Sequence, residues 1–215
     1  MSQLRIACFS ISIDGFGAGL QQSLEQPMGA GGMALHQWVL PTQFFQNMHG
    51  AGGEGTTGVD NDFALRGFDN IGAWILGRNM FGPIRGEWAE SDWRGWWGDN
   101  PPYHTPVFVL THHPREPLVM DGGTTFYFVS DGIESALAQA KAAANGMDVR
   151  LGGGVATVKK FLRAGLVDEM HIAVAPVLLG AGENLFADID LAALGFYCAQ
   201  HVATDNATHY IFKKK

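Results

Sequence analysis

Cysteine and long apolar runs are scarce in this sequence of 215 residues. Its 2 cysteines, Cys8 and Cys198, are too few for a disulfide framework, and because each lies in a predicted strand we expect buried free thiols. No window reaches the roughly 18 apolar residues of a membrane-spanning helix. The N-terminus also lacks the basic segment and apolar stretch of a secretion signal. These absences favour a cytoplasmic protein with no membrane partner.

Positive charge is also in short supply. Lys and Arg number 14 against 21 Asp and Glu, which gives a formal net charge of -7. This balance disfavours nucleic acid and anionic membranes as partners, because both attract basic surfaces. A local basic site for one small anion is compatible with it. The expected partner is therefore a small-molecule substrate.

Hydrophobic residues make up 47% of the chain, enough to fill the core of a single domain over residues 1–215. Glycine recurs densely over residues 17–58, and we expect a long irregular insertion there. Long excursions in compact domains are typically lids over a site or disordered segments, and here a lid is the favoured interpretation.

Short apolar runs alternate with helical periodicity over the rest of the chain. Helices are predicted over residues 62–70, 131–144 and 155–164, the second one capped by Asp131. Strands are expected at 4–11, 73–76, 107–110, 125–129, 147–151, 170–176, 196–203 and 208–212. The last two flank Asp205-Asn206 as a terminal antiparallel hairpin. The pattern predicts an α/β fold with a mixed, mostly parallel sheet.

A glycine turn, Gly152-Gly153-Gly154, joins a predicted strand to a predicted helix. Main-chain amides in such a turn can approach a phosphate closely, and the helix N-terminus adds a favourable dipole. Taken alone, the pattern is equally typical of tight packing. A Rossmann dinucleotide site would need a third glycine where Thr157 stands, and a phosphate-binding P-loop would need Gly-Lys-Ser/Thr.

Two other strand ends carry polar groups that suit the same ligand. Arg78 and Asn79 follow one strand, and Thr111, His112, His113 and Arg115 follow another. Because the carboxyl ends of parallel strands share one edge of a sheet, these groups can converge on one polyanion. Each of them singly is also typical of a solvated surface residue. Adjacent histidines in extended chain point to opposite faces, so we expect no metal site.

Four tryptophans crowd one loop: Trp88, Trp93, Trp96 and Trp97. Such a cluster either forms the wall of a pocket for a flat ring or packs beneath the loop.

In this order, the segments resemble the C-terminal reductase domain of the bacterial riboflavin-biosynthesis deaminase-reductase, a relative of dihydrofolate reductase. The resembling stretches are Ser10 to Gly15, Ile75 to Arg78, Thr111 to His113, Gly152 to Gly154, Ala164 to Glu169 and Pro176 to Gly182. The resemblance implies a three-layer dihydrofolate-reductase-like fold, NADPH as hydride donor and, by likeness to the family, a homodimer.

Site residues follow from the same resemblance. The implied NADPH-binding residues are Ser10, Ser12, Ala18, Gly77, Arg78, Asn79, Thr111, His112, His113, Arg115, Leu151, Gly152, Gly153, Gly154, Val155, Ala156 and Thr157. A cis peptide is implied at Gly152-Gly153. The folate reductases keep an acid before the second strand, where Asp60 and Asp62 lie here, either as proton donor or as a helix cap.

Three residues depart from the family pattern. Phe16 stands in place of a lysine, Leu151 in place of a glutamate and Met80 in place of a threonine. Phe16 and the tryptophans suit an apolar or aromatic substrate, so we expect a heterocycle other than the riboflavin precursor. The alternatives are a non-catalytic NADPH-binding or ligand-binding protein of the same fold, and an NAD-linked Rossmann dehydrogenase.

Overall fold

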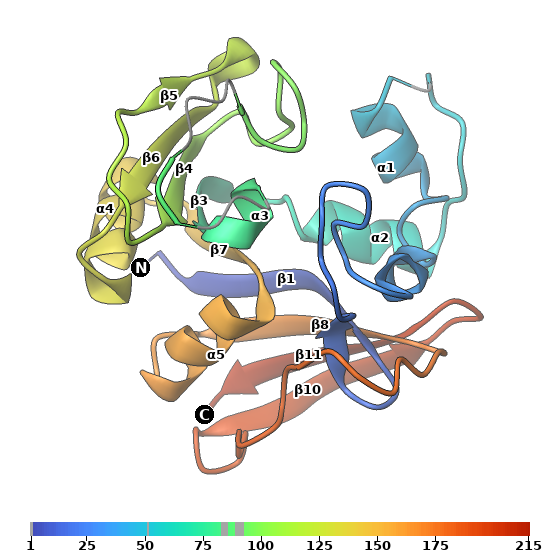
Figure 1. Ribbon diagram of the computed structural model, residues 1–215. Coiled ribbons are helices and arrows are strands. Elements are labelled where there is room, and N and C mark those ends of the chain that lie inside the picture. The colour runs from blue at the N-terminus through green and yellow to red at the C-terminus, as the bar shows by residue number, and fades with distance from the viewer. Residues whose placement is uncertain (1, 51, 83–85, 89–92) are drawn as a thin grey trace.

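The computed structural model describes residues 2–50, 52–82, 86–88 and 93–215, and one large sheet dominates it (Figure 1). The strands of this sheet are β1 (Leu4–Ser12), β3 (Ile71–Gly77), β4 (Pro106–Leu110), β5 (Leu118–Val119), β6 (Thr125–Val129), β7 (Asp148–Gly153), β8 (Glu169–Ala175), β10 (Phe196–Ala203) and β11 (Thr208–Lys214). Their order is β10-β11-β8-β1-β7-β3-β4-β6-β5. A second sheet pairs β2 (Phe16–Ala18) with β9 (Glu183–Asn184).

The centre of the large sheet is parallel and its edges are antiparallel. Strands β8, β1, β7, β3, β4 and β6 pair in parallel, whereas β5 and the β10–β11 hairpin run antiparallel to their neighbours. The predicted mixed sheet with a C-terminal hairpin is confirmed. As a result, the carboxyl ends of β7, β3, β4 and β6 lie next to one another along one edge.

Helices cover both faces of this sheet. The helical segments are η1 (Gly32–His36), α1 (Gln43–Met48), α2 (Val59–Arg66), α3 (Arg78–Phe81), η2 (Asp121–Gly123), α4 (Ile133–Ala143) and α5 (Val155–Arg163). Along β3, Ala73 and Ile75 pack in the core with α4 and α5, whereas Trp74 and Leu76 pack with Phe81 of α3 on the other face. Helix α2 packs with Ala173 on that second face. The resulting three layers confirm the expected architecture.

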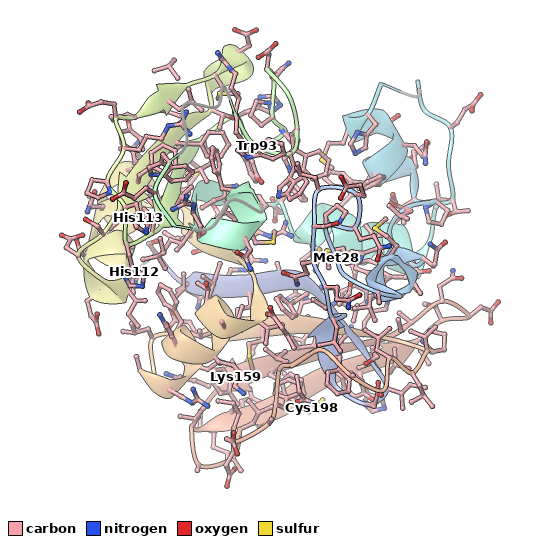
Figure 2. All side chains as sticks on the ribbon, in the orientation of Figure 1. Met28, Trp93, His112, His113, Lys159 and Cys198 are labelled. Atoms are coloured by element: carbon pink, nitrogen blue, oxygen red, sulfur yellow. The ribbon has the colours of Figure 1, made fainter. Side chains whose placement is uncertain are left out.

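Local differences from the sequence prediction have physical causes. The helix expected over residues 62–70 is α2, which begins after Gly58 and ends at Arg66. Strands β2, β5 and β9 were missed because two or three residues carry no periodicity. Cys198 is exposed rather than buried, because β10 is an edge strand whose side chains mostly face solvent (Figure 2).

The glycine-rich insertion has more structure than expected. It contains β2, η1 and α1, and its Trp38 is fully buried and donates a hydrogen bond to Ser10 Oγ at 2.8 Å. Residue Ala51 of this stretch lies outside the described residues. Among the described residues, no helix is long and apolar enough to cross a membrane.

Candidate active site

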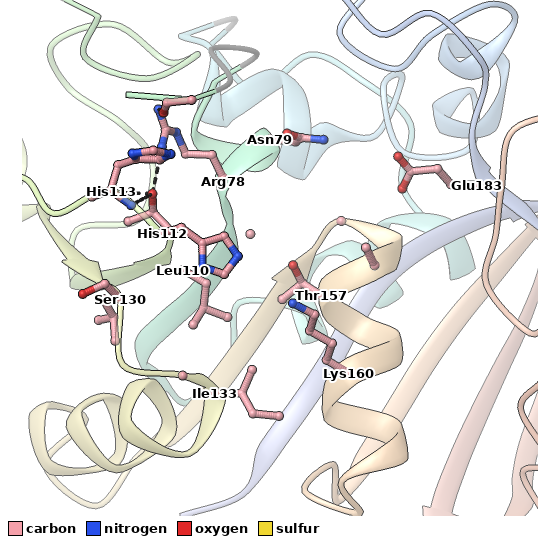
Figure 3. A pocket seen from close by; sticks show the side chains of 17 residues that line it. Arg78, Asn79, Leu110, His112, His113, Ser130, Ile133, Thr157, Lys160 and Glu183 are labelled. Carbon is pink, nitrogen blue, oxygen red and sulfur yellow. Dashed lines mark hydrogen bonds between the residues drawn. The ribbon is translucent and has the colours of Figure 1, made fainter. Parts of the chain in front are cut away.

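The ends of four parallel strands border a cavity of about 420 Å³ (Figure 3). The end of β3 and the start of α3 contribute Gly77, Arg78 and Asn79. The end of β4 and the residues after it contribute Leu110 to His113, and the end of β6 contributes Val129 and the following Ser130. The turn after β7 and the start of α5 contribute Gly154, Ala156 and Thr157. Nine residues predicted to bind the cofactor therefore line one cavity: Gly77, Arg78, Asn79, Thr111, His112, His113, Gly154, Ala156 and Thr157.

Basic side chains face this first cavity from both sides. The Arg78 guanidinium donates hydrogen bonds to Thr111 Oγ1 at 2.8 Å and to the Gly86 carbonyl at 3.1 Å. It also lies 3.3 Å from the centre of the Trp88 ring, so stacking fixes its plane. Lys160, in the second turn of α5, lines the opposite wall. Cations from two elements together with a helix N-terminus make a site that favours an anionic ligand.

The glycine turn leaves the main chain open to this cavity. A Cβ placed on Gly154 would meet no atom within 4 Å, so a ligand can approach the backbone there. At Gly77 a Cβ would collide with Thr157 Oγ1, so glycine is needed for β3 and α5 to lie this close. The cis peptide joins Gly153 and Gly154, one residue later than the resemblance implied.

A second cavity, of about 260 Å³, adjoins the first one and is largely apolar. Its lining includes residues that were predicted to bind the cofactor or the substrate: Ser10, Ala18, Gly152, Gly154, Val155 and Trp97. The insertion supplies another wall through Pro27, Met28, His36, Val39, Phe44 and Phe45. Asn79, Gly154 and Glu183 line both cavities, so the two spaces meet at these residues.

Several predicted site residues lie outside the described lining of both cavities and also make structural contacts. Leu151 is buried in the core beside α4 and α5, and Gly153 is buried within β7. Ser12 holds the first turn through hydrogen bonds with the Asp14 carboxylate and the Phe16 N–H. Phe16, a predicted substrate-pocket residue, is in the same position as these three. The described lining of the two cavities includes none of Ser12, Phe16, Leu151 and Gly153.

The tryptophan cluster divides in the same way. Only Trp97 of the four lines a cavity, and the others donate indole hydrogen bonds to main-chain carbonyls. Trp88 donates to His113, Trp93 to Phe81 and Trp96 to Asn79. Arg115 donates to the Trp93 carbonyl and is absent from the described lining of both cavities. Through these hydrogen bonds, Trp88, Trp93 and Trp96 contact the main chain of the segments that follow β3 and β4.

Asp60 and Asp62 lie on α2 and are not among the described residues that line either cavity. The Asp60 carboxylate accepts hydrogen bonds from His209 Nε2 at 2.8 Å, Thr204 Oγ1 at 2.8 Å and Asn206 Nδ2 at 3.0 Å. Asp62 is exposed in the first turn of α2, where a negative charge stabilises the helix dipole. Neither residue is therefore among the described lining of the two cavities, and the proton-donor prediction stays a prediction.

Asp60 is one end of a chain of hydrogen bonds that runs through two buried histidines, His209 and His171. His171 Nδ1 accepts the Cys8 N–H at 3.1 Å, so its proton sits on Nε2, which faces His209 Nδ1 at 3.0 Å. His209 is then protonated on Nε2 and donates to Asp60. Burial lowers the pKa of both imidazoles, and well below 6.5 for His171. Both rings are therefore neutral in the folded protein.

This histidine pair should make stability depend on pH. Unfolded imidazoles gain protons near pH 6.5, whereas the folded ones do so only at lower pH, so acidification through this window favours the unfolded chain. We expect the free energy of unfolding, measured in urea, to be highest above pH 6.5 and to fall below it. His171→Gln, which retains an acceptor for Cys8, should flatten the slope, and His201→Gln at an exposed position should not. Stability that rises on acidification would contradict this.

Sequence reasoning missed three charged residues that line the cavities: Lys160, Arg150 and Glu183. Lys160 lies in the second turn of the helix after the glycine turn, and this spacing could have indicated that it faces the same ligand. Arg150 was visible as a charge inside an apolar strand. Glu183 is the only acidic residue among the described lining of either cavity, and Figure 3 shows it across the cavity from Arg78. It arrives there by pairing of β9 with β2, which no local pattern indicates.

Comparison with known proteins decides the family. A model of the RibD C-terminal domain matches residues 6–210, nearly the whole chain. The chain belongs to the RibD C-terminal domain family. The family that the resembling stretches predicted is therefore confirmed.

Solved structures with the same fold include other RibD-like proteins. A putative riboflavin biosynthesis protein from Shewanella sp. PV-4 superposes with a TM-score of 0.61 at 22% identity, over 100% of this chain and 99% of that one. RibD of Acinetobacter baumannii gives 0.55 at 19% identity, over 100% of this chain and 58% of its own. A pyrimidine reductase-like protein of Corynebacterium diphtheriae gives 0.53 at 12% identity, over 99% and 91%.

One curated protein, the uncharacterized YyaP of Bacillus subtilis, is 43% identical over 44 residues. This match covers 20% of the RibD-family chain and 23% of YyaP. The chain thus spans about a quarter of that relative and just over half of the Acinetobacter RibD chain. At these identities the solved structures establish the fold.

Proposed function

We propose that this RibD-family domain is an NADPH-dependent reductase that transfers hydride to a small planar heterocycle. The observation that carries the proposal is the junction at Asn79, Gly154 and Glu183. On one side lies a cavity with cations and a helix N-terminus, and on the other lies an apolar cavity with aromatic walls. A dinucleotide with a charged end and a flat reactive ring matches this pair of spaces.

The residues present fit such a cofactor. The open approach to the Gly154 main chain leaves room for a diphosphate at the start of α5. Arg78 and Lys160 supply positive charge on two sides of the same cavity. Asn79 Oδ1 is buried and has no hydrogen-bond partner among the described residues, so the junction holds a free acceptor for a ligand donor.

Each part of the chain then has a distinct task. Bound NADPH would supply the hydride. Main-chain amides of residues 154–157 would bind its diphosphate, and Arg78 and Lys160 its other charges. The insertion and Trp97 would hold the substrate ring and keep water from it. Glu183 would hold the proton that the reduced heteroatom takes up, because it lines both cavities.

Substrate identity is proposed to differ from the riboflavin precursor. Phe16 lies outside the described cavity lining and Leu151 is buried in the core, so neither supplies the charge that the resemblance expects there. The second cavity instead offers Phe44, Phe68 and Trp97. A homodimer and a cytoplasmic location complete the proposal. NADPH binding without oxidation by pterins, flavin precursors or aldehydes would favour the non-catalytic alternative.

Removing one cavity cation tests the cofactor assignment. Calorimetric titration should show NADPH binding at least about tenfold more tightly than NADH, because the 2'-phosphate adds charge to a basic site. Lys160→Met should weaken NADPH binding about tenfold, the loss of one charge-assisted contact. Lys159→Met is the matched control, since Lys159, labelled in Figure 2, neighbours Lys160 but donates a hydrogen bond to the Asn184 carbonyl instead. Equal affinity for NADH, or equal losses in both variants, would refute the assignment.

A further inference from the structure

Arg150 is a buried cation in the floor of the second cavity. It lies on β7, is 7% exposed, and donates hydrogen bonds to the carbonyls of Gly67 at 2.8 Å and Ala7 at 2.9 Å. The guanidinium carbon sits 4.6 Å from the centre of the Phe68 ring and 4.3 Å from that of Trp74. These contacts fix its position and plane. They leave its charge without an opposite charge.

None of the ion pairs among the described residues includes Arg150. Arg5, by contrast, is a buried arginine with two carboxylates beside it, Asp148 at 3.3 Å and Glu169 at 3.6 Å. Arg150 Nε also lacks a hydrogen-bond partner within the described part of the chain. A buried charge without a counter-ion is costly, so the fold retains it at the expense of stability.

The neighbouring titratable groups do not neutralise this charge. Burial raises the pKa of Tyr103 to about 12 and also raises the pKa of the Cys8 thiol, so both are uncharged at neutral pH. Both residues line the cavity together with Arg150. Glu183, the only acid among the described lining residues, stands at the junction with the first cavity. The floor of the second cavity is therefore positive.

The aromatic lining of the same cavity favours flat molecules. Phe68, Trp74 and Tyr103 lie around Arg150, and Trp97 lines the cavity as well. Aromatic faces of this kind bind planar rings, and a low-dielectric wall strengthens any pairing with the guanidinium. We propose that the second cavity binds a planar ring compound bearing an anionic group, with Arg150 as its counter-ion. This rests on the proposed function only for identifying that compound as the substrate.

Specificity is the consequence. A neutral ring would leave Arg150 buried and unpaired, whereas an anionic ring would pair with it, so the site discriminates by charge as well as by shape. Arg150 touches the ligand and the cavity floor but takes no proton, because its guanidinium stays charged. It is a specificity-determining residue.

A matched pair of ligands tests this on the unaltered protein. Quinoline-3-carboxylate and quinoline-3-carboxamide have the same ring and differ in charge. We expect calorimetry without cofactor to show the carboxylate binding at least about tenfold more tightly, the effect of one compensated charge. Arg150→Lys should retain the preference and Arg150→Met should abolish it. Equal affinities in the unaltered protein overturn the proposal, even if Arg150→Met does not fold.

Lys160→Met distinguishes binding of the carboxylate at Arg150 from binding in the proposed cofactor cavity. If the carboxylate bound in the first cavity, Lys160→Met would weaken it, and that result would also overturn the proposal. An unchanged carboxylate preference in Lys160→Met supports Arg150 as the counter-ion. Because no cofactor is present, this holds whether or not NADPH binds.

Discussion

Gly154→Leu is expected to abolish NADPH binding while the protein stays folded. The added side chain would enter the space where the two cavities meet, because a Cβ at this position meets no atom within 4 Å. The residue has φ -76°, which leucine adopts without strain. Losing two charge-assisted hydrogen bonds to main-chain amides, each contributing about 1.5–3 kcal/mol, weakens binding by more than about 100-fold.

Calorimetric titration and urea unfolding together check this expectation. Gly154→Ala is the matched control, since one methyl group narrows the space without filling it, and it should bind NADPH at an intermediate affinity. Unfolding free energies should stay within about 1 kcal/mol of the unaltered protein, the cost of replacing glycine at a helix N-cap. A Gly154→Leu protein that binds NADPH normally would place the cofactor elsewhere.

Asp60→Ala and Glu183→Gln are expected to have opposite effects. Asp60→Ala removes the acceptor for His209, Thr204 and Asn206, and should lower the unfolding free energy by about 2–3 kcal/mol while the folded fraction keeps its turnover. Glu183→Gln should leave stability and NADPH affinity unchanged. Its rate of NADPH oxidation should fall about 100-fold, because the amide cannot transfer the proton.

For both variants, urea unfolding measures stability, and NADPH oxidation with a heterocyclic substrate measures turnover. Asp62→Asn, at an exposed position of the same helix, should change neither quantity by much. Loss of turnover in folded Asp60→Ala would restore that residue as the proton donor. Full turnover in Glu183→Gln would remove Glu183 from the chemistry.

The residues at the carboxyl ends of the parallel strands could be predicted from sequence, because each strand had a local apolar pattern and the parallel topology places these ends together. Short apolar runs identified β3, β4, β6 and β7, and parallel strands must place their carboxyl ends together. For that reason Arg78, Thr111 and the glycine turn were correctly brought to one cavity. Each signal was weak by itself, and their common order along the chain gave the family.

Residues that reach the site through tertiary contacts could not be found in this way. Glu183 arrives through a two-residue strand that pairs with Ala18, some 165 positions earlier. Trp93 and Trp97 lie in one loop without a periodic pattern, so the sequence does not show which of them lines a cavity. Asp60 had the spacing of a catalytic acid, but His209, from the last strand, binds it.

A crystal structure of the protein with saturating NADPH is the most direct test of whether four strand ends bind one cofactor. We expect the diphosphate against the main-chain N–H groups of residues 154–157, with Arg78 and Lys160 beside its charged end. The nicotinamide ring should lie at the junction of Asn79, Gly154 and Glu183, facing the aromatic cavity. NADPH bound at any other place, or side chains closing the first cavity in that crystal, would contradict the account.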